Sequence, residues 1–362
     1  MRTLVISDLH LGARTQTDVL RHPAALDALL QRLDGVEQLV LLGDTLELRH
    51  GPFDEALAIA EPMLRAVGAR LADAEVVLVA GNHDHGLVAD WLEARAASGR
   101  LGLEERADAG ATPRTRRMAE LLAPATLTVA YPGLWVAEGV YATHGHYLDR
   151  HLTVPSLERL AVGAIGRALR TAPAQAAGPD DYELVQAPLY AALDALAARS
   201  VDGRGLTPGS VSTRAWRALQ SDARRTWRAR ATRRAFPLGV GAVNALGLGP
   251  VHADLSGPAL RRSGLDAMRE VVARLRIQAR QVIFGHTHRG GPQIGDDSGE
   301  WALPGGGSLV NSGSWAFEDH YLGRGWGGPY WPGAAVELDT DGVPRPVRLL
   351  DDVPGERLTP RR

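Results

Sequence analysis

In residues 3–10, Thr3-Leu4-Val5-Ile6-Ser7-Asp8-Leu9-His10, a short apolar run leads directly into a carboxylate and an imidazole. The run at residues 3–6 has the length and composition of a buried strand. Two similar runs follow, at 38–42 and 75–80, and they stop at Gly43-Asp44 and at Gly81-Asn82. Apolar residues at helical spacing occupy the intervals, at 24–33 and 56–71.

This strand–helix–strand–helix–strand order predicts parallel strands, whose carboxyl ends meet at one sheet edge where ligands bind. Asp8, Asp44 and Asn82 all fall at that edge. A strand pair around Pro132-Gly133 is predicted at 126–131 and 134–143, and further strands at 281–284, 308–311, 334–338 and 347–350. We therefore expect an α/β fold, a layered α/β/β/α sandwich of two mixed sheets flanked by helices.

Residues 151–270 differ from the rest, because helical stretches at 156–170, 182–199 and 211–234 are separated by Pro, Gly and Asp. We predict a helical cap or insertion at 151–270 within a catalytic domain formed by 1–150 and 271–362. Residues 214–234 hold eight Arg and one acid, Asp222. This Arg-rich segment either binds an anion or is neutralised by acidic groups elsewhere in the chain.

Composition narrows the chemistry that the chain can perform. Its 362 residues are 45% hydrophobic and carry a net charge of −2, so no global field favours nucleic acid or a membrane. The chain has no Cys, which excludes disulfides and thiolate metal sites, and any metal must use N and O ligands. No apolar stretch is long enough for a transmembrane segment, and no export signal is recognisable, so we expect a cytoplasmic protein.

Five short motifs stand at predicted strand ends. They are Asp8-Leu9-His10, Gly43-Asp44, Gly81-Asn82-His83-Asp84, His144-Gly145-His146 and Gly285-His286-Thr287-His288. Each alone has an ordinary structural interpretation as a cap, an Asx turn or a hydrogen-bonded histidine. Taken in order, they supply the two Asp, one Asn and several His that a two-metal hydrolytic site needs.

The residue types suggest a role for each position. Side chains repeat every two residues along an extended segment, so Asp8 and His10 are expected on one side of it, as are the two imidazoles of His286-Thr287-His288. The carboxylate of Asp44 can bridge two cations about 3.5–4 Å apart, and Asn82 can ligate through its carbonyl oxygen. His83 is a candidate proton donor, with Asp84 orienting its imidazole and raising its pKa.

With these motifs the sequence resembles the calcineurin-like metallophosphoesterase superfamily, whose D-x-H, G-D, G-N-H-D/E, H and G-H-x-H signatures stand in the same order. The likeness covers roughly residues 1–148 and 280–340 and includes Asn311-Ser312-Gly313-Ser314-Trp315, which is typical of bacterial members. Two positions depart from the pattern. Glu47 stands three residues after Asp44, which relatives tolerate, and His146 stands where some relatives carry Asp, so its role is open.

The resemblance implies two metal pockets that share one carboxylate. One pocket would hold Asp8, His10, Asp44 and His288; the other would hold Asp44, Asn82, His144 and His286. A hydroxide bridging the metals would attack phosphorus, and His83, which is not a ligand, would protonate the leaving oxygen. Ligands of this type suit two divalent ions of Mn, Fe or Zn. The expected enzyme is a metal-dependent phosphoric ester or diphosphate hydrolase, acting as a phosphatase or phosphodiesterase.

The substrate is expected to be a phosphorylated small molecule or lipid selected by the cap. The UDP-2,3-diacylglucosamine diphosphatases, one bacterial branch of the superfamily, carry a similar helical cap and similar motifs. A nuclease that uses the Arg-rich segment is an alternative, as is a non-catalytic binding protein on the same fold, although the intact ligand set argues against the latter. The sequence leaves the oligomeric state and the role of the Arg-rich segment open.

Overall fold

The structure is a computed structural model that describes residues 1–171, 176–199, 237, 240–246, 249–322 and 327–359. The chain divides into two compact units. The first unit comprises residues 1–146, 190–203 and 277–362, and the second comprises 147–189 and 204–276. The Arg-rich segment and the predicted helix at 211–234 lie outside the described residues.

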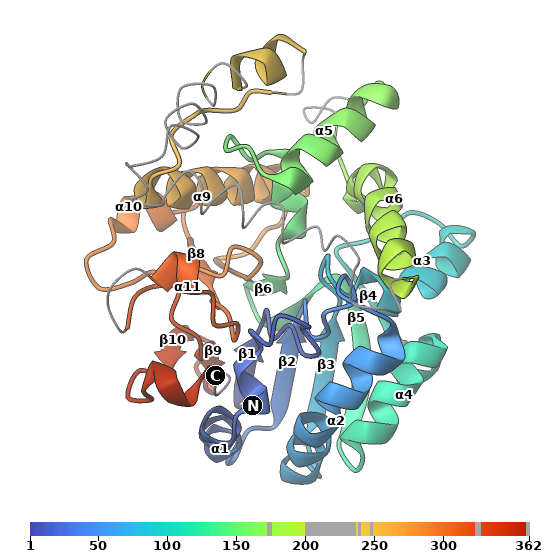
Figure 1. Cartoon of the computed structure of the whole chain (residues 1–362), viewed down its shortest axis with the longest axis vertical. Coiled ribbons are helices and arrows are strands. Elements are labelled where there is room, and N and C mark those ends of the chain that lie inside the picture. The colour runs from blue at the N-terminus through green and yellow to red at the C-terminus, as the bar shows by residue number, and fades with distance from the viewer. Residues whose placement is uncertain (172–175, 200–236, 238–239, 247–248, 323–326, 360–362) are drawn as a thin grey trace. The chain divides into compact units, whose positions relative to one another are not determined.

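The first unit is built on a mixed β-sheet with helices on both sides, which confirms the predicted α/β fold (Figure 1). The strands follow one another in the order β10-β9-β1-β2-β3-β5-β6-β7-β8, and β4 also pairs with β5. Their bounds are β1 Thr3–Ile6, β2 Gln38–Leu42, β3 Glu75–Val79, β4 Glu104–Asp108, β5 Thr126–Ala137, β6 Val140–Thr143, β7 Gln281–Phe284, β8 Ser308–Asn311, β9 Ala334–Leu338 and β10 Pro344–Arg348. The predicted last strand at 347–350 therefore overlaps β10 but begins and ends later.

Strand β5 divides this sheet into two layers. Its residues Thr126 to Ala130 pair with β3, whereas Gly133 to Ala137 pair with β6. Side chains from β1–β3 and from β6–β8 meet in one buried cluster, so the two halves of the sheet face each other. The predicted hairpin at Pro132-Gly133 is wrong, because the strand continues through these residues and turns at Gly139, whose φ of 74° suits glycine.

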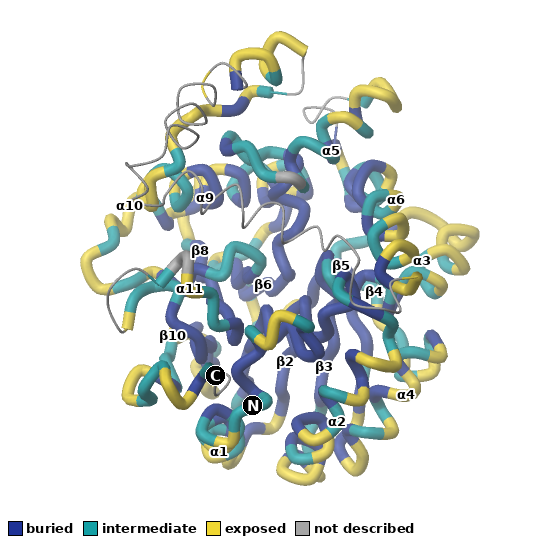
Figure 2. Tube along the Cα trace, in the orientation of Figure 1, coloured by how far each residue is buried: buried dark blue, intermediate teal, exposed yellow. Residues whose placement is uncertain are grey.

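The opposite face of β1–β3 packs against α1 (Pro23–Arg32), α2 (Phe53–Arg70) and α4 (Pro113–Leu122) in a second buried cluster. Strands with both faces covered are apolar throughout, and Figure 2 shows β2 and β3 buried and the outer sides of α2 and α4 exposed. Helix α3 (Ala89–Ala96) and strand β4 were not predicted, since neither has a clear apolar pattern. The remaining short elements are α10 Ser298–Trp301, α11 Asp319–Leu322 and the 3₁₀ turns Val19–Arg21, His85–Leu87, Ala109–Ala111, His146–Arg150 and Gly355–Arg357.

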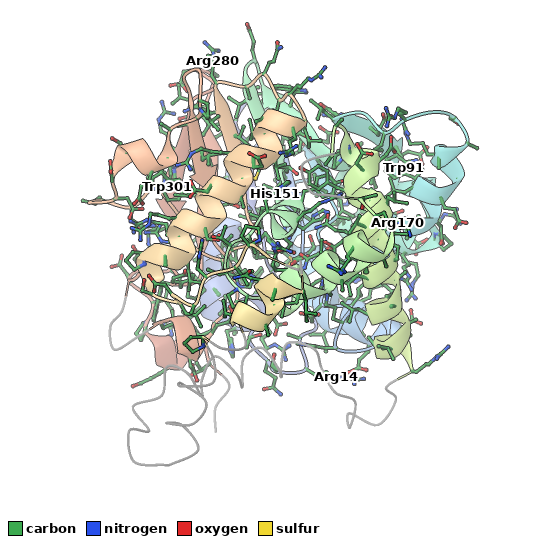
Figure 3. All side chains as sticks on the ribbon, turned by 90° about the horizontal axis from the view of Figure 1, so that it is seen from above. Arg14, Trp91, His151, Arg170, Arg280 and Trp301 are labelled. Atoms are coloured by element: carbon green, nitrogen blue, oxygen red, sulfur yellow. The ribbon has the colours of Figure 1, made fainter. Side chains whose placement is uncertain are left out.

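The second unit is helical in the part that the structure describes. It contains α5 (Leu157–Ala168), the part of α6 (Pro179–Ala198) up to Leu189, and α9 (Gly257–Arg274). Its interior holds a polar contact in which His151 Nε2 lies 2.8 Å from Tyr182 Oη (Figure 3). Helix α6 ends in the first unit, to which residues 190–203 belong. The predicted domain boundaries, 1–150 with 271–362 and 151–270, remain a prediction.

In the described part of the chain, no helix has the length and apolar character that crossing a membrane requires.

Candidate metal centre

Backbone geometry distinguishes the predicted ligands from most other residues. Eight described non-glycine residues have positive φ, and five of them are predicted ligands: Asp8, His10, Asp44, His286 and His288, with φ between 46° and 64°. This left-handed conformation costs roughly 1–2 kcal/mol per residue and persists only where the surroundings enforce it. The prediction that these motifs are extended is wrong. Strand β1 ends at Ile6 and β7 at Phe284, and the side chains gather through tight turns beyond the strand ends.

Glycines in the motifs allow this crowding. A Cβ at Gly43 would overlap the His144 ring, and one at Gly81 would overlap the Asp44 carboxylate. A Cβ at Gly285 would meet Ser7 Oγ and Asp8 Oδ2. In the Gly-Asp, Gly-Asn and Gly-His pairs, the glycine has no side chain, so the side chains of the predicted ligands can pack directly against its backbone.

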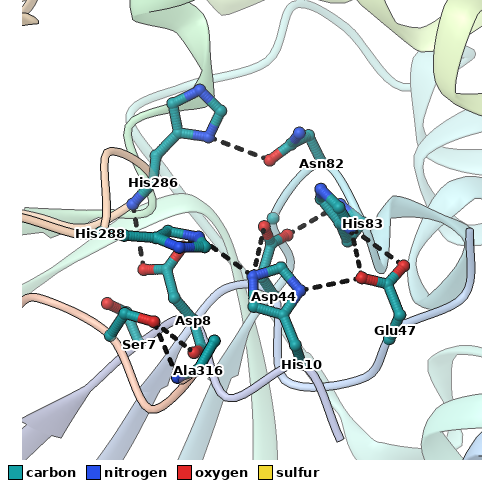
Figure 4. Close-up of polar contacts among 12 residues, drawn as sticks. Ser7, Asp8, His10, Asp44, Glu47, Asn82, His83, His286, His288 and Ala316 are labelled. Atoms are coloured by element: carbon teal, nitrogen blue, oxygen red, sulfur yellow. Dashed lines mark hydrogen bonds and ion pairs between the residues drawn. The ribbon is translucent and has the colours of Figure 1, made fainter. Parts of the chain in front are cut away.

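The first group of converging atoms belongs to Asp8, His10 and His288 (Figure 4). His288 Nε2 lies 3.2 Å from Asp8 Oδ1 and 3.1 Å from His10 Nε2. The Nδ1 atoms face carboxylates, because Glu47 Oε2 lies 3.0 Å from His10 Nδ1 and Glu318 Oε2 lies 2.7 Å from His288 Nδ1. An ionised carboxylate only accepts hydrogen bonds, so each neutral imidazole carries its proton on Nδ1 and turns an Nε2 lone pair inward.

The second group belongs to Asp44, His144 and His286, with Asn82 among them. Asn82 Oδ1 lies 3.1 Å from both His144 Nε2 and His286 Nδ1. His144 Nδ1 lies 3.0 Å from the carbonyl oxygen of Leu42, which can only accept, so Nε2 of the neutral ring is again a lone pair. If the Asn82 amide were turned over, so that its oxygen and nitrogen exchanged places, its nitrogen would donate hydrogen bonds to both rings. In the present orientation its oxygen faces the rings and could ligate a cation.

One oxygen of Asp44 faces both groups. Asp44 Oδ2 lies 3.4 Å from His144 Nε2 and 3.8 Å from His10 Nε2. Its other oxygen, Oδ1, accepts a hydrogen bond of 2.7 Å from the backbone amide of His83. When the rings are neutral, each group therefore brings several acceptor atoms together, and Asp8 Oδ1 is buried next to the Nε2 lone pair of His288. Divalent cations that take N and O ligands fit both groups.

Electrostatics agree with a site that attracts positive charge. Burial raises the pKa of Asp8, but the imidazoles of His288 and His144 together outweigh burial and lower this pKa to about 2. Burial opposes charge on His144, yet the carboxylates of Asp44 and Asp8 raise its pKa to about 9. Burial likewise opposes charge on His288, and Glu318 with Asp8 raises its pKa well above the usual value. Protons and metal ions therefore compete for these imidazoles.

His83 lies beside both groups, and its partners differ from those predicted. Glu47 Oε2 lies 2.8 Å from His83 Nδ1, and Arg49 Nη1 lies 3.1 Å from His83 Nε2. Burial and the charge of Arg49 lower the pKa of His83, although Glu47 acts in the opposite direction. The prediction that Asp84 orients this ring and raises its pKa is therefore wrong. Sequence reasoning noticed Glu47 only as a departure from a motif, and it missed Arg49 and Glu318.

Asp84 organises the backbone instead. Its carboxylate accepts hydrogen bonds from the amides of Gly81 and Thr45, both at 2.7 Å, and from those of Asp44 and Leu46 at 3.2 and 3.3 Å. Burial and the nearby Asp44 raise the pKa of Asp84 to about 6. This buried carboxylate ties together the two loops that carry Asp44 and Asn82.

His146, whose role the sequence left open, lies in the wall of the second group. The residue is 1% exposed, its Nε2 lies 3.2 Å from Tyr131 Oη, and its ring centroid lies 5.6 Å from that of His144. Tyr190 of α6 also packs against this ring, with centroids 5.7 Å apart, and Tyr190 approaches His85 and the guanidinium of Arg49. Burial lowers the pKa of His146 well below the usual value, so the ring is neutral.

Two solved structures resemble the chain at 12% sequence identity. A dimetal phosphatase from Danio rerio aligns over 93% of this chain and 95% of its own length with a TM-score of 0.33. A cold-active protein-tyrosine phosphatase from a psychrophilic Shewanella species aligns over 96% of this chain and 80% of its own length with a TM-score of 0.29. Similarity at this level carries no functional weight by itself. A search of the curated proteins gives no match.

The sequence profile described as calcineurin-like phosphoesterase matches residues 1–221. The match contains the first four motifs, with Asp8, Asp44, Asn82 and His144 among their residues, and it extends beyond the expected break at residue 148. The fold and the convergence of the motif side chains agree with that match. The chain belongs to the calcineurin-like phosphoesterase family.

Proposed function

We propose that the chain is a phosphoric ester or diphosphate hydrolase that holds two divalent cations. One cation would be held by Asp8, His10, Asp44 and His288, and the other by Asp44, Asn82, His144 and His286. The observation that carries this proposal is the position of Asp44 Oδ2, which faces His10 and His144 from between the two groups. Mn, Fe and Zn suit such N and O ligands.

The cations would activate water and polarise the phosphoryl oxygens. The chain's own residues would supply the proton and orient the ester. His83, held between Glu47 and Arg49, is suited to handle a proton at the leaving oxygen because it borders both groups without completing either of the two proposed ligand sets. The Arg49 guanidinium, which also donates to the carbonyl oxygen of Asn82 at 3.1 Å, would place a fixed positive charge beside the reacting phosphate.

We further propose that residues 151–270 select the substrate, which we take to be a phosphorylated small molecule or lipid. Support comes from α6, because its residue Tyr190 packs against His85 and His146 in the first unit. Asp194, one turn further along α6, accepts a hydrogen bond of 3.1 Å from Arg114, which also donates to the carbonyl oxygen of Gly86. These contacts attach α6 to the loop that follows Asn82 and His83.

Hydrolysis assays on protein stripped of metal and then reloaded with Mn²⁺ test the proposal. The substrates would be an aryl phosphomonoester, an aryl phosphodiester and a nucleoside diphosphate ester. We expect turnover of at least one class that needs the added metal, and strongly reduced metal-dependent turnover in Asp44→Asn. Two bound metals without hydrolysis of any substrate would favour a binding protein on the same fold. Cleavage of oligonucleotides in preference to the small esters would favour a nuclease.

A further inference from the structure

Glu318 belongs to none of the sequence motifs, yet it touches one of the proposed ligands. Its Oε2 lies 2.7 Å from Nδ1 of His288, whose Nε2 faces Asp8 at 3.2 Å. The Glu318 side chain is about one quarter exposed, so it reaches the site from its rim. Glu318, His288 and Asp8 thus form a chain of contacts in space, in which the imidazole lies between two carboxylates.

The segment that carries Glu318 is fixed to the loop that carries Asp8. The amide of Trp315 and the hydroxyl of Ser314 both donate to the carbonyl oxygen of Asp8, at 3.0 and 3.2 Å. Two residues later, the amide of Phe317 donates to the carbonyl oxygen of Thr17 at 2.7 Å. Trp315 itself is fully buried. The position of Glu318 relative to Asp8 is therefore set by backbone hydrogen bonds and by packing.

His10 and His288 of the first group differ from His144 of the second group in what supports the imidazole. In the first group both rings are backed by carboxylates, His10 by Glu47 and His288 by Glu318. In the second group His144 is backed by the neutral carbonyl of Leu42. A carboxylate behind a ligating imidazole fixes its tautomer and orientation and increases its basicity, and losing such a partner typically weakens metal binding 10- to 100-fold.

We propose that Glu318 is a positioning residue that orients His288 and makes the Asp8–His10–His288 group the tighter of the two metal sites. This inference rests on the proposed function, because it requires that both groups hold cations. It adds an order of filling: the first group takes its ion at low metal concentration, and the second group fills later.

Stepwise Mn²⁺ binding to metal-free protein, followed by the electron paramagnetic resonance signal of free Mn²⁺, tests the proposal. The variants are Glu318→Ala, which removes the hydrogen bond and the charge, and Glu318→Gln, which keeps an acceptor but loses the charge. The matched control is Asp319→Asn, which neutralises the adjacent, exposed carboxylate. We expect the tighter step to weaken about 10- to 100-fold in Glu318→Ala and less in Glu318→Gln, with the looser step and the control unchanged.

The His144→Ala background identifies which group is affected. Because His144 belongs to the second group, this variant should retain only the tighter step, and adding Glu318→Ala should weaken that step by the same factor as in the parent protein. Circular dichroism of the metal-free variants should match the parent, which separates a metal effect from misfolding.

Two results would overturn the inference: a tighter step of parental affinity in Glu318→Ala, or a loss confined to the looser step. Either result would leave the proposed function standing, provided that the parent protein binds two Mn²⁺ and hydrolyses a phosphate ester. A parent protein that binds no metal would instead remove the proposed function and this inference together.

Discussion

Asp44 and His83 are joined by a hydrogen bond of 2.7 Å from the His83 amide to Asp44 Oδ1. This bond uses one carboxylate oxygen and leaves Oδ2 to face both groups of ligands. It also fixes the backbone of His83 next to the atom that both proposed cations would share. This main-chain hydrogen bond thus fixes the position of the proposed proton donor, His83, relative to the proposed shared ligand, Asp44.

Replacing Asp44 by Asn should abolish the two-metal site, because an amide supplies no negative charge to share between two cations. We expect fewer than two bound metals and a loss of at least ~100-fold in metal-dependent hydrolysis, more than the loss of an outer partner causes. Metal analysis and circular dichroism would check this. Asp339→Asn, at an exposed turn, is the control. Full occupancy of two metals in Asp44→Asn would contradict the assignment.

Replacing His83 by Ala should leave both metals bound and lower the rate by about 10²–10⁴, the usual worth of a positioned acid or base. The loss should be smaller for nitrophenyl esters, whose leaving group needs no proton, than for alkyl esters. His83 also forms a potential ligand group with His10 and Asp44. A fall in metal content in this variant would show that His83 is a ligand and not the acid.

Stability of the metal-free protein should fall as pH rises from about 6.5 to 9. The pKa of His144 is about 9 in the folded chain because of Asp44 and Asp8, and about 6.5 when unfolded. Its protonation therefore stabilises the fold fully below pH 6.5, and this contribution is lost by pH 9. With metal bound the trend should reverse, because metal binding requires neutral imidazoles. Urea unfolding of both forms would check this, and parallel pH profiles would refute it.

Gly43→Ala should disrupt the second group of ligands. Gly43 has a φ of 85°, and a Cβ there would overlap the His144 ring. Gly99→Ala is a matched control, because Gly99 also has positive φ, 133°, but a Cβ there meets nothing within 4 Å. We expect Gly99→Ala to cost only backbone strain, about 1–2 kcal/mol, with normal metal binding. Urea unfolding and metal titration would separate the two effects, and equal behaviour of the two variants would contradict the steric argument.

The sequence predicts the first three strands well, because β1, β2 and β3 are buried on both faces and their apolar runs end at polar residues. It fails at β5, where a Pro-Gly pair that usually marks a turn lies inside a continuous strand. It also misses β4, whose charged residues suit an edge strand and resemble a loop. The sequence pattern therefore locates strands that are buried on both faces, whereas β4 and the full length of β5 are defined only by their pairing with other strands.

The motif residues could be listed from the sequence, but the way in which they meet could not. Asp8 and His10 converge through positive φ angles that spacing does not reveal. Glu47 and Glu318 act through hydrogen bonds to imidazoles that are distant in sequence, so no local pattern marks them. The predicted role of Asp84 failed for the same reason, since its carboxylate binds four backbone amides instead of the adjacent ring.

The passage of β5 from one layer of the sheet to the other has a mechanical consequence. It sends Asp8, Asp44 and Asn82 to the site from one layer of the sheet, and His144, His286 and His288 from the other. A pair of cations held by these residues would act as cross-links between the layers, joining His10 to a residue 278 positions further along the chain. Cross-links that close long loops restrict the open chain most strongly. Bound metal would thus oppose separation of the layers, and we expect slower amide hydrogen exchange in β6 and β7 when metal is bound.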